Sequence, residues 1–463
     1  MFRKCDVLYV HSTKNPISGD NKRFGIMPMG IIAILNALRV KGYDVLGINM
    51  AVEATLDPEF SLSDMLKDIQ YKVLLTDLHW YEHSFGAMYV ATESKAICPK
   101  VPVVIGGYTA TLYGKEILEN FSAVDFAVIG DSDLPMEQLI DYLIGNADIA
   151  LEEIPNLIYR ENSGVVVGEK SWVQTSLDML DFVSLDYFHN AEHIPYLSVS
   201  GLSKKATPNQ WLCIARGCLY NCAYCCGAKD NMQVLFHRSN ILKCSAEKVA
   251  ADFNAIAQKG YRVSPSHDLQ MFGTAYYKEV FERIRQTGVK PMLYLEHFQL
   301  PTKDFVDEVE KTFIPDKTIL EISPISGNEQ LRKENGKFFS NEQLYEMVEY
   351  ILSKGIKVQL YYTVNIVGET KEQFSDTLFQ MKYMRMALGV RDIYYQRVVI
   401  DPLAGMREWE GVNAEYNTFM DYYRYCQIPH SEKLTVTGFN DQGALSSEKK
   451  MQMFESIFSK GER

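Results

Sequence analysis

Short apolar segments alternate with helical patterns along most of this 463-residue chain. Such an alternation is typical of βαβ units, in which parallel strands form a sheet and helices cover its faces. The alternation runs in two series, and between them, over residues 147–206, the periodicity fades. A chain of this length is too long for one hydrophobic core, so we predict two α/β domains joined by a linker.

The first series predicts a doubly wound, flavodoxin-like domain over residues 1–146. In open sheets of this kind, ligands bind beyond the carboxyl ends of the strands. The predicted strands are 5–11, 43–50, 72–80, 101–107 and 124–130, and the predicted helices are 28–41, 62–69, 85–97, one beginning at Tyr113, and 134–144.

The second series predicts a barrel domain over residues 207–402. Six βα units fit a curved parallel sheet, either closed or partial. The preceding linker contains a small hairpin that turns at Asn162, Ser163 and Gly164, and residues 403–463 either cover the barrel mouth or form a packing extension. The predicted barrel strands are 210–217, 267–272, 291–298, 318–325, 357–367 and 392–400.

Composition excludes several classes of function. A formal net charge of −12 argues against a broad surface for nucleic acid. No run of about 18 apolar residues is present to span a bilayer, and the first residues do not resemble a signal peptide, so we expect a cytoplasmic protein. Its nine cysteines would then stay reduced, and five of them fall between Cys213 and Cys226.

Three cysteines of this group stand in "CLYNCAYC" at the spacing CxxxCxxC: Cys218, Cys222 and Cys225. Three thiolates in one short loop indicate a metal site that is open on one side, whereas a closed structural site would want four ligands. The alternative is a buried or zinc-binding triplet. For Cys213 and Cys226 we expect packing roles, although Cys226 could contact the site.

Strand ends of the first domain carry candidate ligand-binding residues. "IGGYTA" holds Gly106, Gly107 and Thr109, and "VIGDSD" holds Gly130, where a backbone could approach a ligand closely. A tight turn with close helix packing would explain the glycines equally well. His79 and His83 flank Trp80 in "TDLHWYEHSFG" and could bind a cofactor, but histidines beside aromatic residues are more often packing residues.

"CIARGCLYNCAYC" resembles the cluster loop of the radical S-adenosylmethionine (radical SAM) superfamily. The domain order resembles its cobalamin-dependent branch, because "VPVVIGGYTAT" and "VDFAVIGDSD" are similar to the fourth and fifth strand ends of the cobalamin domain. "IVGETKEQFSDT" resembles the "GxPGET" helix start of the barrel, with the proline and the first glycine altered. The resemblance covers about residues 1–405.

This resemblance implies a flavodoxin-like cobalamin-binding domain followed by a partial (β/α)6 barrel. Cys218, Cys222 and Cys225 would hold a [4Fe–4S] cluster whose fourth iron is left for SAM. Tyr224 would pack against SAM or the cluster. Glu321 and Ser323 match an "ES" position that contacts SAM, and a buried structural hydrogen bond is at least as good an explanation for the other candidate residues, which are Phe272, Gly273, Glu296, Asn365, Gln396 and Arg397.

The cobalamin domain departs from one family pattern. Many cobalamin domains supply a lower axial histidine from a DxHxxG motif, and this sequence lacks it. His11 ends the first strand in "HSTKNPISG", which does not fit that motif. We therefore predict that the lower cobalt face has no such histidine.

The implied function is methylation of an unactivated carbon, or a phosphorus, in a small molecule or natural-product intermediate through a 5′-deoxyadenosyl radical and methylcobalamin. A non-methylating rearrangement, oxidation or carbon–carbon bond formation is the alternative. An iron–sulfur electron-transfer or sensor protein is disfavoured, because an electron carrier uses four cluster ligands. A flavodoxin or ferredoxin would supply electrons. Tyr361, Tyr362, Tyr394 and Tyr395 could serve as lid or stacking residues, although core packing explains them better.

Overall fold

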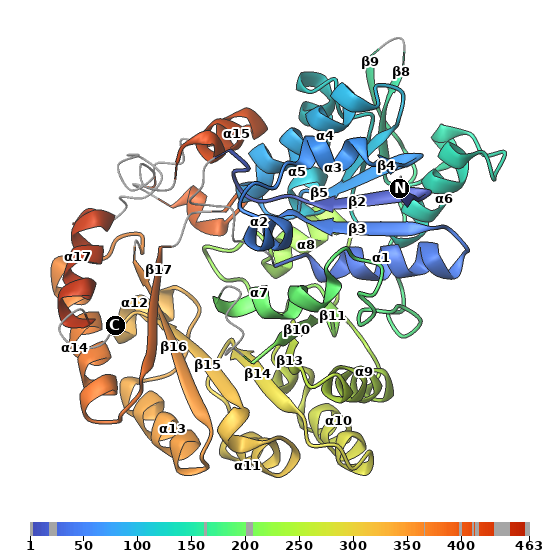
Figure 1. Ribbon diagram of the computed structural model, residues 1–463. Coiled ribbons are helices and arrows are strands. Elements are labelled where there is room, and N and C mark those ends of the chain that lie inside the picture. Colours follow the sequence, from blue (N-terminus) through green and yellow to red (C-terminus); the bar gives the residue numbers. More distant parts are fainter. Residues whose placement is uncertain are drawn as a thin grey trace. The chain divides into compact units, whose positions relative to one another are not determined.

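The computed structural model divides the chain into two compact units (Figure 1). Unit 1 comprises residues 1–209, 234–238 and 417–431, and unit 2 comprises residues 210–233, 239–416 and 432–463. The structure describes residues 3–17, 26–161, 164–200, 207–364, 366–397, 401–409, 412, 416–429 and 445–458.

A seven-stranded sheet in the order β3-β2-β5-β6-β7-β8-β9 forms the centre of unit 1. Its first five members are parallel, as the alternating pattern predicts. These are β3 (Val45–Asn49), β2 (Val7–His11), β5 (Val73–Asp77), β6 (Val103–Gly106) and β7 (Phe126–Val128). A two-stranded parallel pair, β1 (Arg3–Lys4) and β4 (Ile69–Gln70), lies outside this sheet.

Both faces of this sheet are buried. Side chains on a strand alternate between the two faces, so successive residues of one strand belong to different cores. Val7 and Tyr9 of β2 belong to one hydrophobic core, and Leu8 and Val10 belong to the other. The first core includes helices α1 (Met29–Val40) and α6 (Asp133–Ile144). The second includes α3 (Leu62–Lys67), α4 (Ser84–Ile97) and α5 (Tyr108–Asn120), while the short helix α2 (Met50–Leu56) contributes to both cores.

Two features of unit 1 differ from the sequence prediction. Helix α5 begins at Tyr108, five residues before the predicted start, because Gly107 adopts φ 113° and turns the chain directly from β6 into the helix. The predicted hairpin is present as β8 (Leu157–Glu161) and β9 (Gly164–Val167), but β8 pairs antiparallel with β7. The segment predicted as a linker therefore extends the sheet. Asn162 and Ser163 lie outside the described residues.

Unit 2 contains a six-stranded sheet in the order β10-β13-β14-β15-β16-β17, which follows the order of the chain. Pairing is parallel from β13 to β17, and no pairing between β10 and β17 closes the sheet within the described part of the chain. The strands are β10 (Asn209–Leu212), β13 (Arg262–Pro265), β14 (Met292–His297), β15 (Ile319–Ile325), β16 (Lys357–Val364) and β17 (Asp392–Arg397).

One barrel strand was predicted at the wrong place. Residues 267–272 were expected to be extended, but Leu269–Phe272 form a 3-10 helix, η5, and the strand β13 precedes it. The side chain of Asp268 caps this helix by accepting a hydrogen bond from the Gln270 backbone N–H at 2.9 Å. The β13 sequence "RVSP" has a single large apolar residue, so periodicity gave it too little weight.

Helices lie between successive strands of this sheet, in keeping with a series of βα units. Helices α13 and α14 begin with capping boxes in which Ser340 and Thr370 are the N-caps. The helices are α9 (Ala246–Gln258), α10 (Thr274–Gln286), α11 (Lys303–Thr312), α12 (Glu329–Glu334), α13 (Asn341–Ser353) and α14 (Lys371–Met386).

The C-terminal residues are divided between the two units, which differs from an extension over the barrel alone. Helix α15 (Phe419–Gln427) belongs to unit 1, where the Glu116 carboxylate accepts hydrogen bonds from its first two backbone N–H groups at 2.9 and 3.2 Å. Helix α17 (Ser447–Phe458) belongs to unit 2. Among the described residues, no helix is long and apolar enough to cross a membrane.

A buried ion pair attaches α17 to the barrel. Lys450 Nζ donates to Glu369 Oε2 at 2.5 Å, and both side chains are almost completely buried. Phe454, one turn further along α17, stacks on Tyr395 of β17 with 4.7 Å between the ring centroids. Because β17 is an edge of the sheet, this packing covers the edge strand.

We expect the substitution Lys450→Met to destabilise unit 2 by about 3–5 kcal/mol, because it leaves the Glu369 carboxylate buried without a cation. Urea unfolding followed by circular dichroism would measure the change. Lys449→Met is the matched control: Lys449 is exposed, and we expect a change within about 0.5 kcal/mol. Removing both charges, with Glu369→Met added to Lys450→Met, should restore much of the loss. Equal stability of the Lys450 and Lys449 variants would contradict this account.

Candidate functional site

The cysteine loop begins directly after the first strand of unit 2. Its base is closed by the short antiparallel pair β11 (Ala215–Arg216) and β12 (Leu242–Lys243). At its start Gly217 adopts φ 96°, and its carbonyl accepts a hydrogen bond from His267 Nε2 at 2.9 Å. Ser266 Oγ donates to His267 Nδ1 at 2.7 Å, which orients the ring. The carboxyl end of β13 therefore holds the start of the loop.

All three cysteines of the triplet are partly buried free thiols. Cys218 Sγ accepts a hydrogen bond from the Tyr220 backbone N–H at 3.4 Å, and Cys225 Sγ accepts one from the Gly227 N–H at 3.2 Å. Hydrogen bonds of this kind stabilise a negatively charged sulfur and tune iron–sulfur clusters. The donor set therefore fits metal-bound thiolates.

Without a metal ion, the surroundings of Cys218 and Cys225 favour the neutral thiol. Burial raises the pKa of Cys218, and burial together with the Asp401 carboxylate raises the pKa of Cys225 to about 12. A thiolate at these positions needs a nearby positive charge, which a coordinated metal would provide. Cys213 is buried, and the Cys226 backbone N–H donates to Asp401 Oδ2 at 3.2 Å.

Tyr224 packs in a small apolar cluster with Val367, Ala404 and Met406. The Met406 backbone N–H donates to the Ala223 carbonyl at 2.8 Å, which joins the cysteine loop to the segment that follows β17. The aromatic residue of the loop therefore also has a structural role.

Polar side chains from adjacent strands meet inside the sheet of unit 2. The strand register aligns Glu296 of β14 with Glu321 of β15 and Gln359 of β16. The Tyr294 hydroxyl donates to Glu321 and lies 3.3 Å from Glu296 Oε1, and Gln359 Nε2 donates to Glu321 Oε2 at 3.1 Å. Ser323 Oγ lies 3.4 Å from Glu321 Oε1, so the predicted "ES" pair is in contact.

This cluster holds two neighbouring carboxyl groups that cannot both ionise readily. Burial, and secondly the charge of Glu296, raises the pKa of Glu321 to about 8. Glu296 is solvent-exposed, yet desolvation by the protein around it raises its pKa as well. At neutral pH, Glu321 is therefore largely protonated.

Lys337 was missed in the sequence. Its side chain is buried, and Nζ donates to the Phe298 carbonyl at 2.8 Å. Burial lowers its pKa, while Cys222, Glu321 and Glu296 act on it in the opposite direction. The Lys337 amine therefore interacts electrostatically with both the cysteine loop and the carboxyl cluster. Nothing in the loop "ENGKFF" distinguishes this lysine from a solvated one.

Only some of the other predicted SAM-binding residues of unit 2 lie in the described part of the chain. Phe272 lies edge-on to Tyr276, 5.3 Å between centroids, and 6.1 Å from the ring of His267, which contacts the cysteine loop. Gly273 follows with φ 92°, ends η5 and begins α10. Asn365 lies outside the described residues, as do the side chains of Gln396 and Arg397 at the end of β17.

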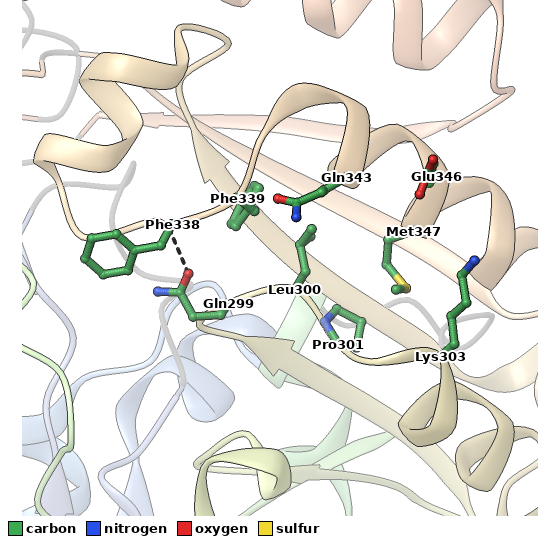
Figure 2. A pocket seen from close by; sticks show the side chains of 9 residues that line it. All are labelled: Gln299, Leu300, Pro301, Lys303, Phe338, Phe339, Gln343, Glu346 and Met347. Atoms are coloured by element: carbon green, nitrogen blue, oxygen red, sulfur yellow. Dashed lines mark hydrogen bonds between the residues drawn. The ribbon is translucent and has the colours of Figure 1, made fainter.

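A separate pocket of about 440 Å³ opens in unit 2 between the segment after β14 and the start of α13 (Figure 2). Phe338 is 69% exposed there, and its backbone N–H donates to Gln299 Oε1 at 3.0 Å. The pocket contains none of the predicted site residues, and it is lined by Gln299, Leu300, Pro301, Lys303, Phe338, Phe339, Gln343, Glu346 and Met347.

In unit 1, His79, Gly107 and Thr109 lie together at the carboxyl edge of the sheet. Thr109 Oγ1 and its backbone N–H donate to the His79 carbonyl at 2.9 and 3.1 Å. A Cβ atom at Gly107 would lie 2.8 Å from the backbone nitrogen of His79. The close approach that requires this glycine is thus made by the protein's own backbone.

Gly106 and Gly130 border the same edge. A Cβ at Gly106 would lie 3.3 Å from the Val128 carbonyl oxygen. Gly130 adopts φ 65°, and its N–H donates to Thr111 Oγ1 at 2.9 Å. Asp131, the next residue, is buried in an ion pair with Arg238.

The two candidate histidines have different surroundings. His79 is half-buried beside Trp80, 4.9 Å between ring centroids, and burial lowers its pKa, so its imidazole is neutral at pH 7. His83 is completely buried and lies against His11 and Asp77 instead. Of the two, only His79 is exposed at the edge where a ligand could bind.

A comparison with protein families finds a match in unit 1. Residues 22–140 match the B12-binding domain family. Curated protein sequences give no significant match to the chain.

Solved structures resemble the chain over its whole length. TsrM from Kitasatospora setae, a radical S-adenosylmethionine methyltransferase with cobalamin and a [4Fe-4S] cluster bound, aligns over 100% of both chains at 14% identity with a TM-score of 0.65. TsrM with tryptophan substrate and the SAM analogue aza-SAM covers 87% of this chain and 75% of its own, at 16% identity and a TM-score of 0.61.

OxsB, a cobalamin-dependent S-adenosylmethionine radical enzyme with aqua-cobalamin bound, covers 99% of this chain and 62% of its own, at 12% identity and a TM-score of 0.60. At sequence identities of 12–16%, these structural similarities establish the fold alone. Residues 22–140 are therefore similar to the B12-binding domain family, and the chain has a fold like that of TsrM and OxsB, which confirms the fold class predicted from its sequence.

Proposed function

We propose that this chain is a cobalamin-dependent radical SAM enzyme that methylates an unactivated carbon, or a phosphorus, of a small molecule. One combination carries the proposal: a B12-binding family match in residues 22–140 and the motif CxxxCxxC after the first barrel strand, in a chain with the fold of TsrM. The proposed domains are residues 1–146 for cobalamin, 147–206 as the connection, 207–402 for the cluster and SAM, and 403–463 as the extension.

Cys218, Cys222 and Cys225 would hold the cluster. A [4Fe–4S] cluster on three cysteines supplies the electron that cleaves SAM, bound at the fourth iron, and cobalamin supplies a carrier for the methyl group. Lys337 would offset part of the negative charge that the thiolates bring to the loop, because the charges of this lysine and of Cys222 act on each other.

The carboxyl cluster would bind the polar groups of SAM. Glu321 is largely protonated at neutral pH, so it can donate a hydrogen bond as well as accept those of Tyr294 and Gln359. Glu296, which is exposed, would face a positively charged group of the ligand. Ser323, Phe272, Gly273, Asn365 and Gln396 remain predicted contacts, with Tyr224 packing beside the cluster.

Cobalamin would bind at the carboxyl edge of unit 1, near His79, Gly106, Gly107, Thr109 and Gly130. The fit rests on chemistry as well as position: the His79 imidazole is neutral and half-exposed, which suits a hydrogen bond to an uncharged ligand group.

A small-molecule substrate is supported by TsrM, whose structure holds tryptophan. An external electron donor such as flavodoxin or ferredoxin would reduce the cluster. The alternative reaction is a non-methylating rearrangement, oxidation or carbon–carbon bond formation on the same architecture.

We expect Cys218→Ala, Cys222→Ala and Cys225→Ala each to abolish reductive cleavage of SAM, because the loss of one thiolate leaves the cluster without its ligand set. The measurement is 5′-deoxyadenosine formation, together with iron and sulfide content, after anaerobic reconstitution. Cys226→Ala is the control, because Cys226 lies outside the CxxxCxxC triplet, and it should keep the cluster. Full activity in any of the three variants would refute the assignment.

We expect His11 not to coordinate cobalt. Its side chain is fully buried, and its Nδ1 lies 2.8 Å from Asp77 Oδ1. Electron paramagnetic resonance of the cob(II)alamin form should therefore show no splitting from an axial nitrogen, and His11→Gln should leave the spectrum unchanged. A nitrogen splitting that disappears in His11→Gln would show the opposite.

Methyl transfer has a distinct product signature. SAM would be used twice, once as methyl donor and once as radical source, so S-adenosylhomocysteine and 5′-deoxyadenosine should form in comparable amounts. SAM with a deuterated methyl group should pass its label to the product. Deoxyadenosine formed with a genuine substrate, but without S-adenosylhomocysteine or label transfer, would favour the alternative reaction.

A further inference from the structure

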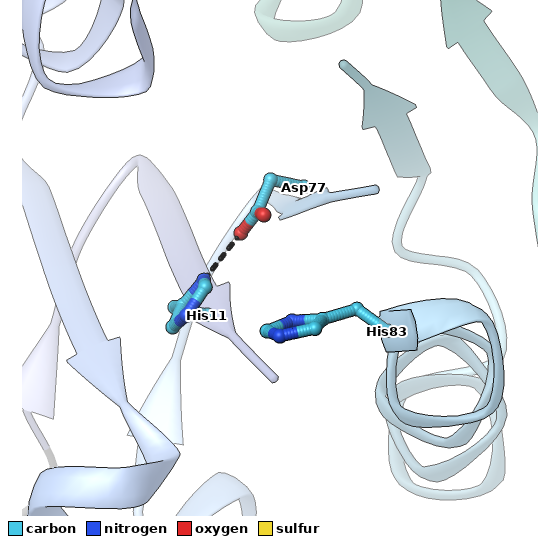
Figure 3. A group of neighbouring side chains, drawn as sticks. All are labelled: His11, Asp77 and His83. Atoms are coloured by element: carbon cyan, nitrogen blue, oxygen red, sulfur yellow. Dashed lines mark hydrogen bonds and ion pairs between the residues drawn. The ribbon is translucent and has the colours of Figure 1, made fainter. Parts of the chain in front are cut away.

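Three side chains with metal-binding atoms lie together inside unit 1 (Figure 3). His11 ends β2, Asp77 ends the neighbouring strand β5, and His83 is the N-cap of α4. One potential ligand atom from each residue lies within 4.8 Å of the other two, and all three residues are buried. The cluster is separate from the cysteine loop, which belongs to unit 2.

The carboxylate at its centre is already oriented. Asp77 Oδ1 accepts a hydrogen bond from Tyr9 at 2.6 Å and lies 2.8 Å from His11 Nδ1. The ring centroids of His11 and His83 are 5.1 Å apart.

Buried polar atoms that find no partner gather at the same place. They belong to four residues, and within the described part of the chain none of these atoms has a hydrogen bond: His11 Nε2, Ser12 Oγ, Thr13 Oγ1 and Asp77 Oδ2. Native proteins leave only a few such atoms per 100 residues, and a local group of them indicates an ion or water. This observation is independent of the donor geometry.

We propose that His11, Asp77 and His83 bind a divalent first-row transition metal ion, separate from the cluster and from the cobalt of cobalamin. Two imidazoles and a carboxylate, without a thiolate, are the donors that Zn²⁺, Fe²⁺ and Mn²⁺ share. The ion would also offset the charge of the buried carboxylate. Tyr9 would orient Asp77 from outside the coordination sphere.

The geometry requires a small adjustment. Zn–N bonds of about 2.0–2.1 Å place neighbouring ligand atoms about 3.3 Å apart in a tetrahedron, less than the 4.8 Å limit found here, so one side chain must move inward. A hydroxyl of Ser12 or Thr13, or a water molecule, would complete the coordination. Uptake of the ion releases any proton held on the ligating nitrogens.

Zinc binding to the full-length chain tests this proposal. The background is the triple variant Cys218→Ala, Cys222→Ala, Cys225→Ala, free of cobalamin, because it removes the thiolates of the cysteine triplet and the cluster iron. Titration with Zn²⁺ against a chromophoric chelator should show one site per chain. Co²⁺ in the same site should give a spectrum of nitrogen and oxygen ligation, without a thiolate charge-transfer band.

Variants of the ligands locate the site. Asp77→Asn, which keeps the size of the side chain, and His83→Gln should each weaken Zn²⁺ binding at least 100-fold. His193→Gln, a partly exposed histidine outside the cluster, is the control and should keep the full affinity. Absence of a zinc site in the triple variant would overturn the proposal whether or not the ligand variants fold. Equal affinity in His83→Gln and His193→Gln would overturn it as well.

Discussion

Both units depend on the same constraint: parallel strands end at one edge of a sheet, and the residues that follow them are forced together there. In unit 2 this edge brings His267, which follows β13, onto the first residue of the cysteine loop at 2.9 Å. In unit 1 it brings the ends of β2 and β5 together as His11 and Asp77. Residues far apart in sequence therefore meet without any local pattern that connects them.

The protein offsets the cost of burying a carboxyl group in three different ways. Asp77 lies beside the imidazoles of His11 and His83, burial and secondly the charge of Glu296 raise the pKa of Glu321, and Glu369 is paired with the ammonium group of Lys450. Removing a carboxylate from water costs several kcal/mol unless such a partner is present. Asp77 and Glu321 can still bind a ligand. The Glu369 carboxylate is paired with Lys450 and stabilises the packing of α17.

Sequence reasoning succeeded where one short segment carried the whole signal. The five parallel strands of the unit 1 sheet were visible because each is a short, mostly apolar run, and the cysteine triplet was visible because its ligands are close together in the chain. It failed where the signal was weak or distributed. β13 has one large apolar residue, Lys337 lies in an ordinary polar loop, and His83 gains its significance only when α4 places it against two strand ends.

The division of the C-terminal residues between the units has a consequence for folding. Helix α15 packs its aromatic side chains on unit 1, with Tyr422 4.9 Å from Tyr81 and Tyr423 4.9 Å from Phe121. Asn15 Nδ2 also donates to the carbonyls of Cys426 and Gln427, at 3.2 and 3.1 Å. These contacts span more than 300 residues, so unit 1 cannot complete its packing until the residues of α15 have been synthesised. Until then the side chain of Tyr81, in η2 (Tyr81–His83), lacks the aromatic ring of Tyr422 that packs against it.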